Sequence, residues 1–235
     1  MISYQTLKKI LFKFEPETAH NLAEYGLRIL GKCKIAKAYM EKKNYISNPK
    51  LTQEIFGVRF ENPVGLAAGF DKNATMIKSM KSLGFGFTEI GTMTPKPQDG
   101  NPKPRMFRYP ELKSVQNAMG FNNKGAHEVL KNLKKVYPFS IPVGANIGKN
   151  KFTPEEFALS DYKSLIKKFE ANSDYLVINI SSPNTPNLRD LQNEKFITEL
   201  FTMARELTEK PILLKIAPDM EVQMAINLCY SAINA

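Results

Sequence analysis

The stretch YLVINISSPNTPNLR, residues 175–189, carries the strongest indication of the fold. Its first six residues form an apolar run, rich in the β-branched and aromatic side chains that favour a buried strand. The run then opens into asparagines, serines and prolines, a dense set of hydrogen-bonding side chains on a turn. A strand that ends in this way offers a polar ledge on which a ligand could be held.

Four more apolar runs end in polar residues in the same manner. They are VGLAA (64–68), FTEIGT (87–92), IPVGANI (141–147) and PILLKIA (211–217). Helical patterns lie between the runs, near residues 73–83, 123–136, 154–171 and 194–209. This alternation predicts a parallel sheet with right-handed crossovers. A (β/α)8 barrel places its active site at the carboxyl ends of such strands, and a doubly wound sheet also binds ligands there. No GxGxxG motif follows a strand, which weakens a dinucleotide-binding interpretation.

The first 48 residues follow a different pattern. Lysine-bearing amphipathic helices are expected over residues 4–14, after Pro16 and around residues 36–43. From the pattern alone, these helices either cap the following domain or lie on an anionic membrane surface. The segment LTQEIFGVRFENP then predicts two short strands that pivot near Gly57. We therefore divide the chain into a helical extension, residues 1–48, and an α/β domain, residues 49–235.

Composition limits the classes of function only loosely. The net charge of +10, from 33 basic and 23 acidic residues, suits nucleic acid or an anionic membrane, and equally a solvated basic surface. The two cysteines, Cys33 and Cys229, lack metal-ligand spacing and predict neither a disulfide framework nor a metal site. No apolar run reaches the length of a bilayer span, and the N-terminus lacks a signal-peptide pattern.

The polar residues at the strand ends are candidates for ligand binding. Thr92, Asn146 and Asn179 offer neutral donors and acceptors, which suit a flat heterocycle better than a metal. Lys72 follows a glycine-bearing turn, and Lys215 lies in an apolar strand where burial is costly without an anionic partner. Any one of these residues could equally stabilise a turn or decorate the surface. A separate loop is expected to carry Asn117, Asn122 and Asn123.

Ser182 lies in the polar turn with no base beside it in the sequence. A serine nucleophile needs an adjacent base, and both histidines, His20 and His127, are expected in helices away from the strand-end loops. There is also no GxSxG motif, so a hydrolase triad is not supported. A serine can still accept a proton when the substrate gives up a hydride in the same reaction. This points to oxidation of a carbon–carbon bond with a flavin as hydride acceptor.

Seven long motifs, in order along the chain, resemble dihydroorotate dehydrogenase of class 2, the membrane-associated, quinone-dependent type. They are FEPETAH, NPVGLAAGFDKN, EIGTMTPKPQDGNPKPRMFR, NAMGFNN, GANIGKNK, NISSPNTPNLR and LLKIAPD. The resemblance implies a (β/α)8 barrel that binds FMN, here about five of eight β/α units, with an N-terminal extension that meets the membrane. It also implies oxidation of dihydroorotate to orotate in pyrimidine (UMP) biosynthesis, with ubiquinone or menaquinone as acceptor. A bacterial chain would then be a peripheral protein on the cytoplasmic face of the cell membrane.

The resemblance also implies roles for individual residues. Ser182 takes the position of the base that removes the C5 proton of dihydroorotate, and Thr185 would help to carry that proton away. The substrate would be bound by Lys72, Asn117, Ala118, Met119, Gly120, Phe121, Asn179 and Asn184. FMN would be bound by Ala68, Gly69, Phe70, Asp71, Lys72, Thr92, Asn146, Asn179 and Lys215. The quinone tunnel would be lined by His20 and Arg108.

Ser182 itself favours a resemblance to class 2, because class 1 enzymes carry the motif NxSCPN, with cysteine at this position. The family continues beyond the equivalent of residue 235, so we expect an incomplete barrel that binds FMN poorly by itself. Two alternatives stay open. One is a dihydrouridine synthase, an FMN barrel acting on transfer RNA, which the charge suits but the positions of the cysteines do not. The other is a catalytically inactive scaffold. The main interpretation predicts no nucleic-acid partner.

Overall fold

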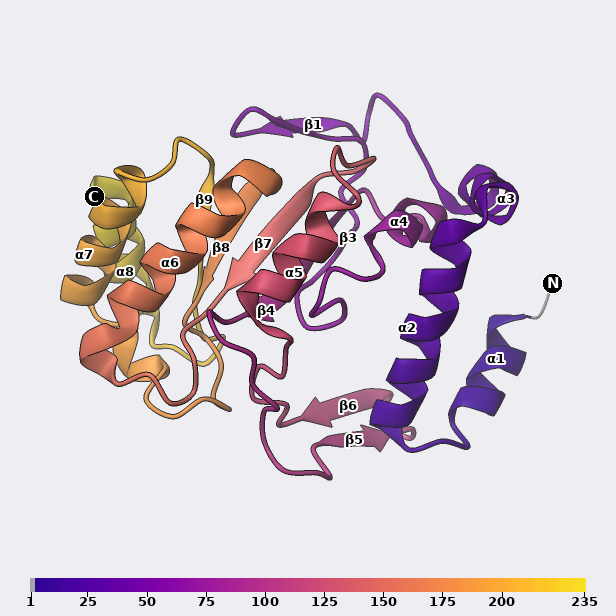
Figure 1. Cartoon of the computed structure of the whole chain (residues 1–235), viewed down its shortest axis with the longest axis horizontal. Coiled ribbons are helices and arrows are strands. Elements are labelled where there is room, and N and C mark those ends of the chain that lie inside the picture. Colours follow the sequence, from indigo (N-terminus) through magenta and orange to yellow (C-terminus); the bar gives the residue numbers. More distant parts are fainter. Residues whose placement is uncertain (1–2) are drawn as a thin grey trace.

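A five-stranded parallel sheet forms the centre of the computed structural model, which describes residues 3–235 (Figure 1). The strand order is β3-β4-β7-β8-β9. The strands are β3 (Gly65–Leu66), β4 (Phe87–Met93), β7 (Val143–Ile147), β8 (Tyr175–Asn179) and β9 (Ile212–Lys215). Each lies within one of the five apolar runs expected from the sequence, apart from one residue at the end of β4. Within the described residues β3 and β9 remain edges, so the sheet is an open arc of a barrel.

Helices follow the strands and cover the outer face of the sheet (Figure 1). They are α4 (Ile77–Met80), α5 (Gly125–Lys134), α6 (Ala158–Phe169), α7 (Glu194–Arg205) and α8 (Val222–Asn234). The helix expected over residues 73–83 is much shorter than predicted and ends in a 3-10 turn, Lys81–Leu83. The reason lies before it: the Asp71 carboxylate accepts the backbone N–H groups of Thr75 and Met76, which holds this segment as a turn.

Two antiparallel hairpins flank the sheet. The first joins β1 (Gln53–Ile55) to β2 (Val58–Phe60) through Phe56 and Gly57, both at positive φ, and confirms the predicted pivot. The second joins β5 (Met106–Tyr109) to β6 (Ser114–Asn117) and was not expected from the sequence. Asn117 is the last residue of β6, so the prediction that it lies on a loop was wrong.

The N-terminal helices are α1 (Tyr4–Leu11), α2 (Pro16–Lys32) and α3 (Lys34–Asn44). The Glu15 carboxylate accepts the N–H groups of Glu17 and Thr18 at the start of α2, directly before a proline in the first turn. At the other end of this region, Asn44 donates to the Ser82 carbonyl at 2.9 Å and so fixes α3 to the α/β domain. Among residues 3–235 no helix combines the length and apolar character needed to cross a bilayer.

The hydrophobic core lies between the sheet and its helices. Its fully buried members include Ile90, Val143, Leu165, Leu176 and Leu200. The strand register brings the carboxyl ends of the strands to one level: Gly91 pairs with Asn146, and Asn179 pairs with Lys215. The polar residues that end these strands therefore meet at a single edge of the sheet.

Candidate active site

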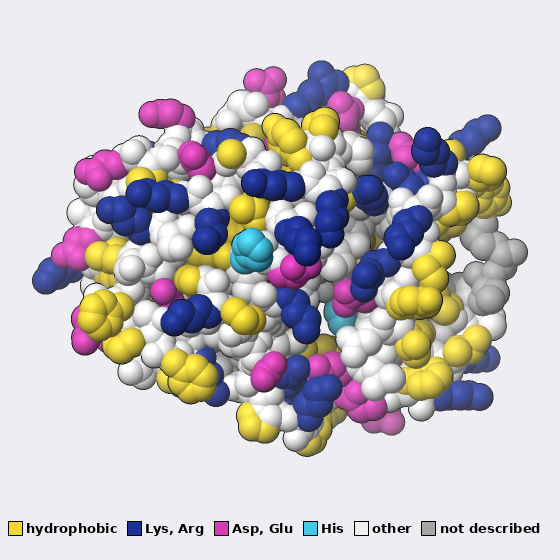
Figure 2. Space-filling view, viewed as in Figure 1, with side chains coloured by type: hydrophobic (Ala, Val, Ile, Leu, Met, Phe, Trp, Pro, Cys, Tyr) yellow, Lys and Arg dark blue, Asp and Glu magenta, His cyan; other side chains and the backbone are white. Residues whose placement is uncertain are grey.

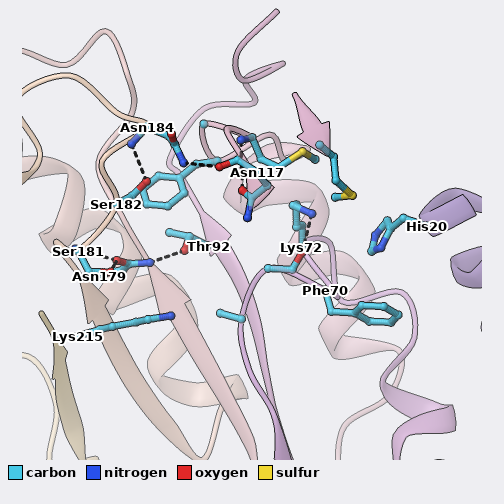
Figure 3. A pocket seen from close by; sticks show the side chains of 16 residues that line it. His20, Phe70, Lys72, Thr92, Asn117, Asn179, Ser181, Ser182, Asn184 and Lys215 are labelled. Atoms are coloured by element: carbon cyan, nitrogen blue, oxygen red, sulfur yellow. Dashed lines mark hydrogen bonds between the residues drawn. The ribbon is translucent and has the colours of Figure 1, made fainter. Parts of the chain in front are cut away.

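A cavity of about 500 Å³ opens at the carboxyl ends of the strands (Figure 3). Residues from α2, β4, β5, β6, β8 and β9 reach it, together with the segments that follow β3, β6 and β8. Its lining includes most of the predicted site residues: Ala68, Gly69, Phe70, Lys72, Thr92, Asn117, Met119, Gly120, Phe121, Asn179, Ser182, Asn184 and Lys215. It also includes His20, Met106 and Ser181. Segments more than 190 residues apart in the chain thus form one site.

The floor of the cavity is a hydrogen-bonded cluster of buried polar side chains. The Asn179 amide donates to Thr92 Oγ1 at 2.8 Å and to Asn146 Oδ1 at 3.2 Å, and the Thr92 hydroxyl donates to Asn146 Oδ1 at 2.6 Å. Asn146 is fully buried and does not line the cavity. It therefore holds Thr92 and Asn179 in place, and those two present their polar atoms to a ligand.

The turn after β3 forms one wall. Gly69, at φ +107°, donates its N–H to the Gly91 carbonyl at 2.7 Å, and open space lies where a Cβ would stand. The Lys72 ammonium donates to the Gly69 carbonyl at 2.6 Å. Asp71 is 1% exposed and does not line the cavity; its carboxylate caps the following turn. In this turn a ligand can meet the backbone of Gly69 and the side chain of Lys72.

Two basic side chains on this wall have lowered pKa values. Burial lowers the pKa of Lys72, although the carboxylates of Glu17 and Glu24 oppose the shift. Burial also lowers the pKa of His20, and the nearby Lys72 charge lowers it further. The His20 ring packs edge-on against Phe70, with 4.9 Å between ring centroids. At neutral pH His20 is therefore an uncharged imidazole between α2 and the cavity, and Lys72 gains from an anionic partner.

The opposite wall is formed by the segment after β6 and the polar turn after β8. The Asn184 amide donates to the Asn117 carbonyl at 3.4 Å and so joins the two. Gly120 and Phe121 both have positive φ, which folds this segment over the cavity. Ala118 does not line the cavity; its N–H donates to the Arg105 carbonyl, and its own carbonyl accepts from the Asn101 amide.

Ser182 lies half-buried in the cavity wall, with its Oγ accepting the N–H of Asn184 at 3.2 Å. Among the described residues no imidazole or carboxylate is hydrogen-bonded to it. Both histidines lie in helices, as expected, and His20 reaches the lining of the same cavity from α2. Thr185 is 3% exposed, does not line the cavity, and has no hydrogen-bond partner for Oγ1 within residues 3–235.

A buried ion pair that the sequence did not reveal lies beside the cavity. Glu17 of α2 and Arg105 are joined by two bonds, of 3.1 and 2.7 Å, and are 6% and 7% exposed. Arg105 also donates to the carbonyls of Asp99 and Asn101, and it lowers the pKa of Glu17. The Asn101 amide in turn reaches the carbonyls of Ala118 and Asn184. The ion pair thus connects the helical extension to both loops of the opposite wall.

Arg108, the second residue predicted to line a quinone tunnel, lies outside the cavity. It extends from β5 toward the N-terminal helices, where its guanidinium stacks 4.2 Å from the centroid of the Phe12 ring. It also donates to the Phe14 carbonyl at 3.4 Å. His20 therefore reaches the cavity from the extension, whereas Arg108 reaches the extension from the hairpin.

The fold and the cavity define a partial (β/α)8-type barrel with a polar ligand site at the carboxyl ends of its strands. A family model described as dihydroorotate dehydrogenase matches residues 50–235. The chain therefore belongs to the dihydroorotate dehydrogenase family.

Individual relatives agree with this assignment. A protein of a Nitratiruptor species, named dihydroorotate dehydrogenase (quinone), is 58% identical over 234 residues, which is 100% of this chain and 67% of the relative. A protein of the same name from a Sulfurovum species is 60% identical over 233 residues, or 99% of this chain and 66% of the relative. The chain spans about two thirds of the length of the curated relatives it matches.

Solved structures confirm the predicted architecture. The crystal structure of dihydroorotate dehydrogenase from Eimeria tenella in complex with ferulenol matches with a TM-score of 0.80 and 35% identity, covering 93% of this chain and 64% of that one. The ligand-free form from the same organism matches with a TM-score of 0.80 and 36% identity, covering 93% of this chain and 66% of that one. The α/β barrel prediction, with five of its β/α units in this chain, is therefore confirmed.

Proposed function

We propose that this chain carries the flavin and dihydroorotate site of a quinone-dependent dihydroorotate dehydrogenase, which oxidises dihydroorotate to orotate in pyrimidine (UMP) biosynthesis. One observation carries the proposal: Lys72, Asn117, Asn179, Ser182 and Asn184 converge on one cavity. The names of the relatives support the same reaction and do not favour a dihydrouridine synthase or an inactive scaffold.

The residues of the cavity fit FMN as the flavin. The open space at Gly69 lets the backbone approach a flat ring, and Thr92 and Asn179 present neutral hydrogen-bonding groups to its polar edge. Lys215, opposite Asn179 in the strand register, places a cation where it would stabilise negative charge on the reduced ring. Asn146 and Asp71 act behind this surface by holding Thr92 and the Gly69 turn. When bound, FMN supplies the acceptor for the hydride that leaves C6 of dihydroorotate.

The opposite wall would bind the pyrimidine ring. The Lys72 ammonium, now donating to the Gly69 carbonyl, can pair with the carboxylate of the substrate. The amides of Asn117, Asn179 and Asn184 match the alternating N–H and C=O groups of the ring. The Ala118–Phe121 segment closes over them, and the positive φ of Gly120 and Phe121 shapes this cover.

Ser182 would act as the base. Its Oγ would take the C5 proton as the hydride leaves C6, while the hydroxyl's own proton is passed on, and the Asn184 N–H bonded to that oxygen would stabilise the negative charge that develops when that proton leaves. The buried, unpartnered Thr185 hydroxyl lies three residues further along the turn and would pass the proton on. The role of each residue is proposed on the basis of its place in the cavity and the resemblance to the family.

The helical extension, residues 1–48, would bring the quinone to the flavin. His20 lines the cavity from α2 as an uncharged imidazole, and Arg108 reaches the extension from the hairpin. Figure 2 shows hydrophobic side chains gathered over the N-terminal helices, with lysines and arginines beside them. These features support a peripheral position on a membrane. We place it on the cytoplasmic face, with ubiquinone or menaquinone as acceptor, because the resemblance to the family implies it.

The decisive experiment follows the flavin itself. Residues 1–235 are joined to the part of the Nitratiruptor relative that follows the aligned segment, and the purified protein is loaded with FMN without oxygen. We expect dihydroorotate to bleach the visible flavin absorption and a quinone to restore it. The unmodified relative is the positive control. If both proteins bind FMN but dihydroorotate bleaches only the relative, the proposed function is wrong.

A further inference from the structure

We propose that the β5–β6 hairpin is a second membrane contact, which inserts its tip beside α1 into a bilayer that contains anionic lipids. This inference rests on the peripheral membrane position proposed above and adds an element to it. The residues concerned are Phe107 to Val115 of the hairpin, and Phe12 and Phe14 at the corner between α1 and α2.

The hairpin presents large apolar side chains to solvent. Leu112 is 76% exposed at the tip, Val115 is 59% exposed, and Phe107 and Tyr109 are about 40% exposed. The tip is a tight turn: the Lys113 N–H donates to the Pro110 carbonyl at 3.2 Å, and Lys113 has positive φ. Apolar side chains gathered on such a projecting turn indicate an interaction site rather than part of the core.

The hairpin is attached to the helical extension rather than only to the barrel. The Arg108 guanidinium stacks on the Phe12 ring and donates to the Phe14 carbonyl. Phe12 and Phe14 are themselves 40% and 43% exposed. Figure 1 places the β5–β6 turn beside the start of α2. The apolar residues of the hairpin and of the α1–α2 corner therefore belong to one surface.

The charges around this surface favour an anionic bilayer as the occupant. Lys8, Lys9 and Lys13 lie in residues 3–14 with no acidic residue among them. At the tip Lys113 follows Glu111, so the hairpin adds no net negative charge. Apolar side chains within a rim of lysines match the boundary between acyl chains and negatively charged headgroups. The C-terminus lies at the opposite end of the molecule, away from α1 (Figure 1).

The absence of tryptophan from the chain allows a direct test. Three single-tryptophan variants of the 235-residue chain are compared: Leu112→Trp at the tip, Ile10→Trp on α1, and Phe152→Trp, at an 85% exposed position outside the proposed surface. Each is mixed with phosphatidylcholine–phosphatidylglycerol vesicles whose acyl chains carry bromine. Because a surface helix inserts to about 5–10 Å, we expect roughly twofold quenching and a blue shift for Leu112→Trp and Ile10→Trp only.

Each other outcome overturns the inference in a recognisable way. If the tryptophan of Ile10→Trp is quenched and that of Leu112→Trp is not, α1 contacts the membrane and the hairpin does not. Quenching of neither would contradict the membrane position itself. A blue shift of Leu112→Trp that depends on protein concentration without vesicles would show that a second copy covers the tip.

A second measurement does not depend on a probe. Leu112→Ser should lower the affinity for the same vesicles, measured by co-sedimentation, by about tenfold. This is roughly the factor that corresponds to the free energy of burying one leucine side chain. Phe152→Ser is the matched control and should bind as the unmodified chain does. Equal binding by both variants would exclude the hairpin tip from the contact. Both positions are exposed, so neither variant should change the urea midpoint, which checks that the proteins remain folded.

Discussion

The strand-end cavity buries polar side chains that are hydrogen-bonded to one another, whereas the N-terminal helical extension exposes apolar side chains to solvent. In the cavity, the buried side chains of Thr92, Asn146 and Asn179 satisfy one another through hydrogen bonds of 2.6–3.2 Å. In the extension, apolar side chains such as Ile35 and Ile29 are 84% and 52% exposed. A closed polar network fixes its own geometry, whereas an exposed apolar face needs another surface to cover it. The cavity is therefore preformed, and the extension is built for contact.

The two regions meet at the Glu17–Arg105 ion pair, which joins α2 to the loops above the cavity. This contact suggests how a helix suited to a membrane surface can hold His20 at a fixed place in a catalytic cavity.

The largest effect is expected from Ser182→Ala in the FMN-loaded hybrid protein. Without the proposed base, the rate at which dihydroorotate bleaches the flavin should fall by about 10²–10⁴-fold. Stopped-flow absorbance measures this rate directly. Ser181→Ala is the matched control, since the Ser181 hydroxyl donates to Asn179 Oδ1 in the same cavity, and it should change the rate far less. Equal losses in the two variants would remove Ser182 from the chemistry.

Arg105→Ala should destabilise the chain by about 3–5 kcal/mol, because it leaves the Glu17 carboxylate buried without its partner. Urea unfolding measures the loss. Lys103→Ala is the control: its ammonium lies 3.4 Å from the same carboxylate but is 65% exposed, so the change should stay within about 1 kcal/mol.

The difference in free energy of unfolding between the unmodified chain and Arg105→Ala should depend on pH with a definite sign. Arg105 lowers the pKa of Glu17 in the folded state, so the contribution of the pair is present above the unfolded pKa of the carboxyl. It is lost as the pH falls through the lowered folded pKa. The gap between the unmodified chain and Arg105→Ala should therefore narrow in acid, and a gap that widens would contradict the ion-pair account.

Two threonines on β4 distinguish satisfied from unsatisfied buried hydroxyls. Thr92→Val should cost about 1–3 kcal/mol, because it removes a hydroxyl bonded to Asn146 and Asn179. Thr88→Val should be neutral or stabilising, because Thr88 Oγ1 is buried without a partner among the described residues. Urea midpoints compare the two. A larger loss for Thr88→Val would mean that the cluster at the floor of the cavity contributes little.

Binding of orotate should weaken as the pH rises. Burial lowers the pKa of Lys72, so its ammonium loses its charge at a lower pH than a solvated lysine does. Above that pKa, affinity should fall by at most about tenfold per pH unit. Equilibrium dialysis of orotate across pH measures the slope. Lys72→Arg keeps the positive charge and should abolish the pH dependence of orotate binding. A slope that persists in this variant would assign the pH dependence to another group.

The smallest effect is expected in the extension. Ile35→Ser should change the free energy of unfolding by no more than about 0.5 kcal/mol, because the side chain is almost fully exposed. The same urea measurement applies. A loss as large as that of Thr92→Val would mean that this face of α3 is packed rather than open, and the contrast between the two regions would fail.

Most of the sheet could be predicted from the sequence, because each strand is an apolar run that ends in polar residues. The same signal predicted Thr92, Asn179 and Lys215 as cavity residues, since parallel strands bring their carboxyl ends together. Lys72 and Ser182 were found in the same way, from the turns that follow β3 and β8.

The remainder depends on contacts that no local pattern reveals. Glu17 and Arg105 are 88 positions apart, and in its local sequence each resembles an ordinary surface residue. The β5–β6 hairpin is hard to predict because its strands are only four residues long and Pro110 interrupts the pattern between them. His20 reaches the cavity only through the packing of α2 against the turn after β3, which tertiary structure decides. Asp71 and Asn146 were predicted to bind FMN, but neither lines the cavity; Asp71 caps the turn after β3, and Asn146 is hydrogen-bonded to Thr92 and Asn179.

A comparison of the two half-reactions in one protein shows directly whether the cavity and the helical extension serve different steps. Flavin reduction by dihydroorotate and reoxidation of dithionite-reduced flavin by quinone are timed by stopped flow in the hybrid protein, with Ser182→Ala and His20→Ala. We expect Ser182→Ala to slow only flavin reduction and His20→Ala to slow only flavin reoxidation. If both substitutions slow the same half-reaction, the cavity and the helical extension do not divide the chemistry as proposed.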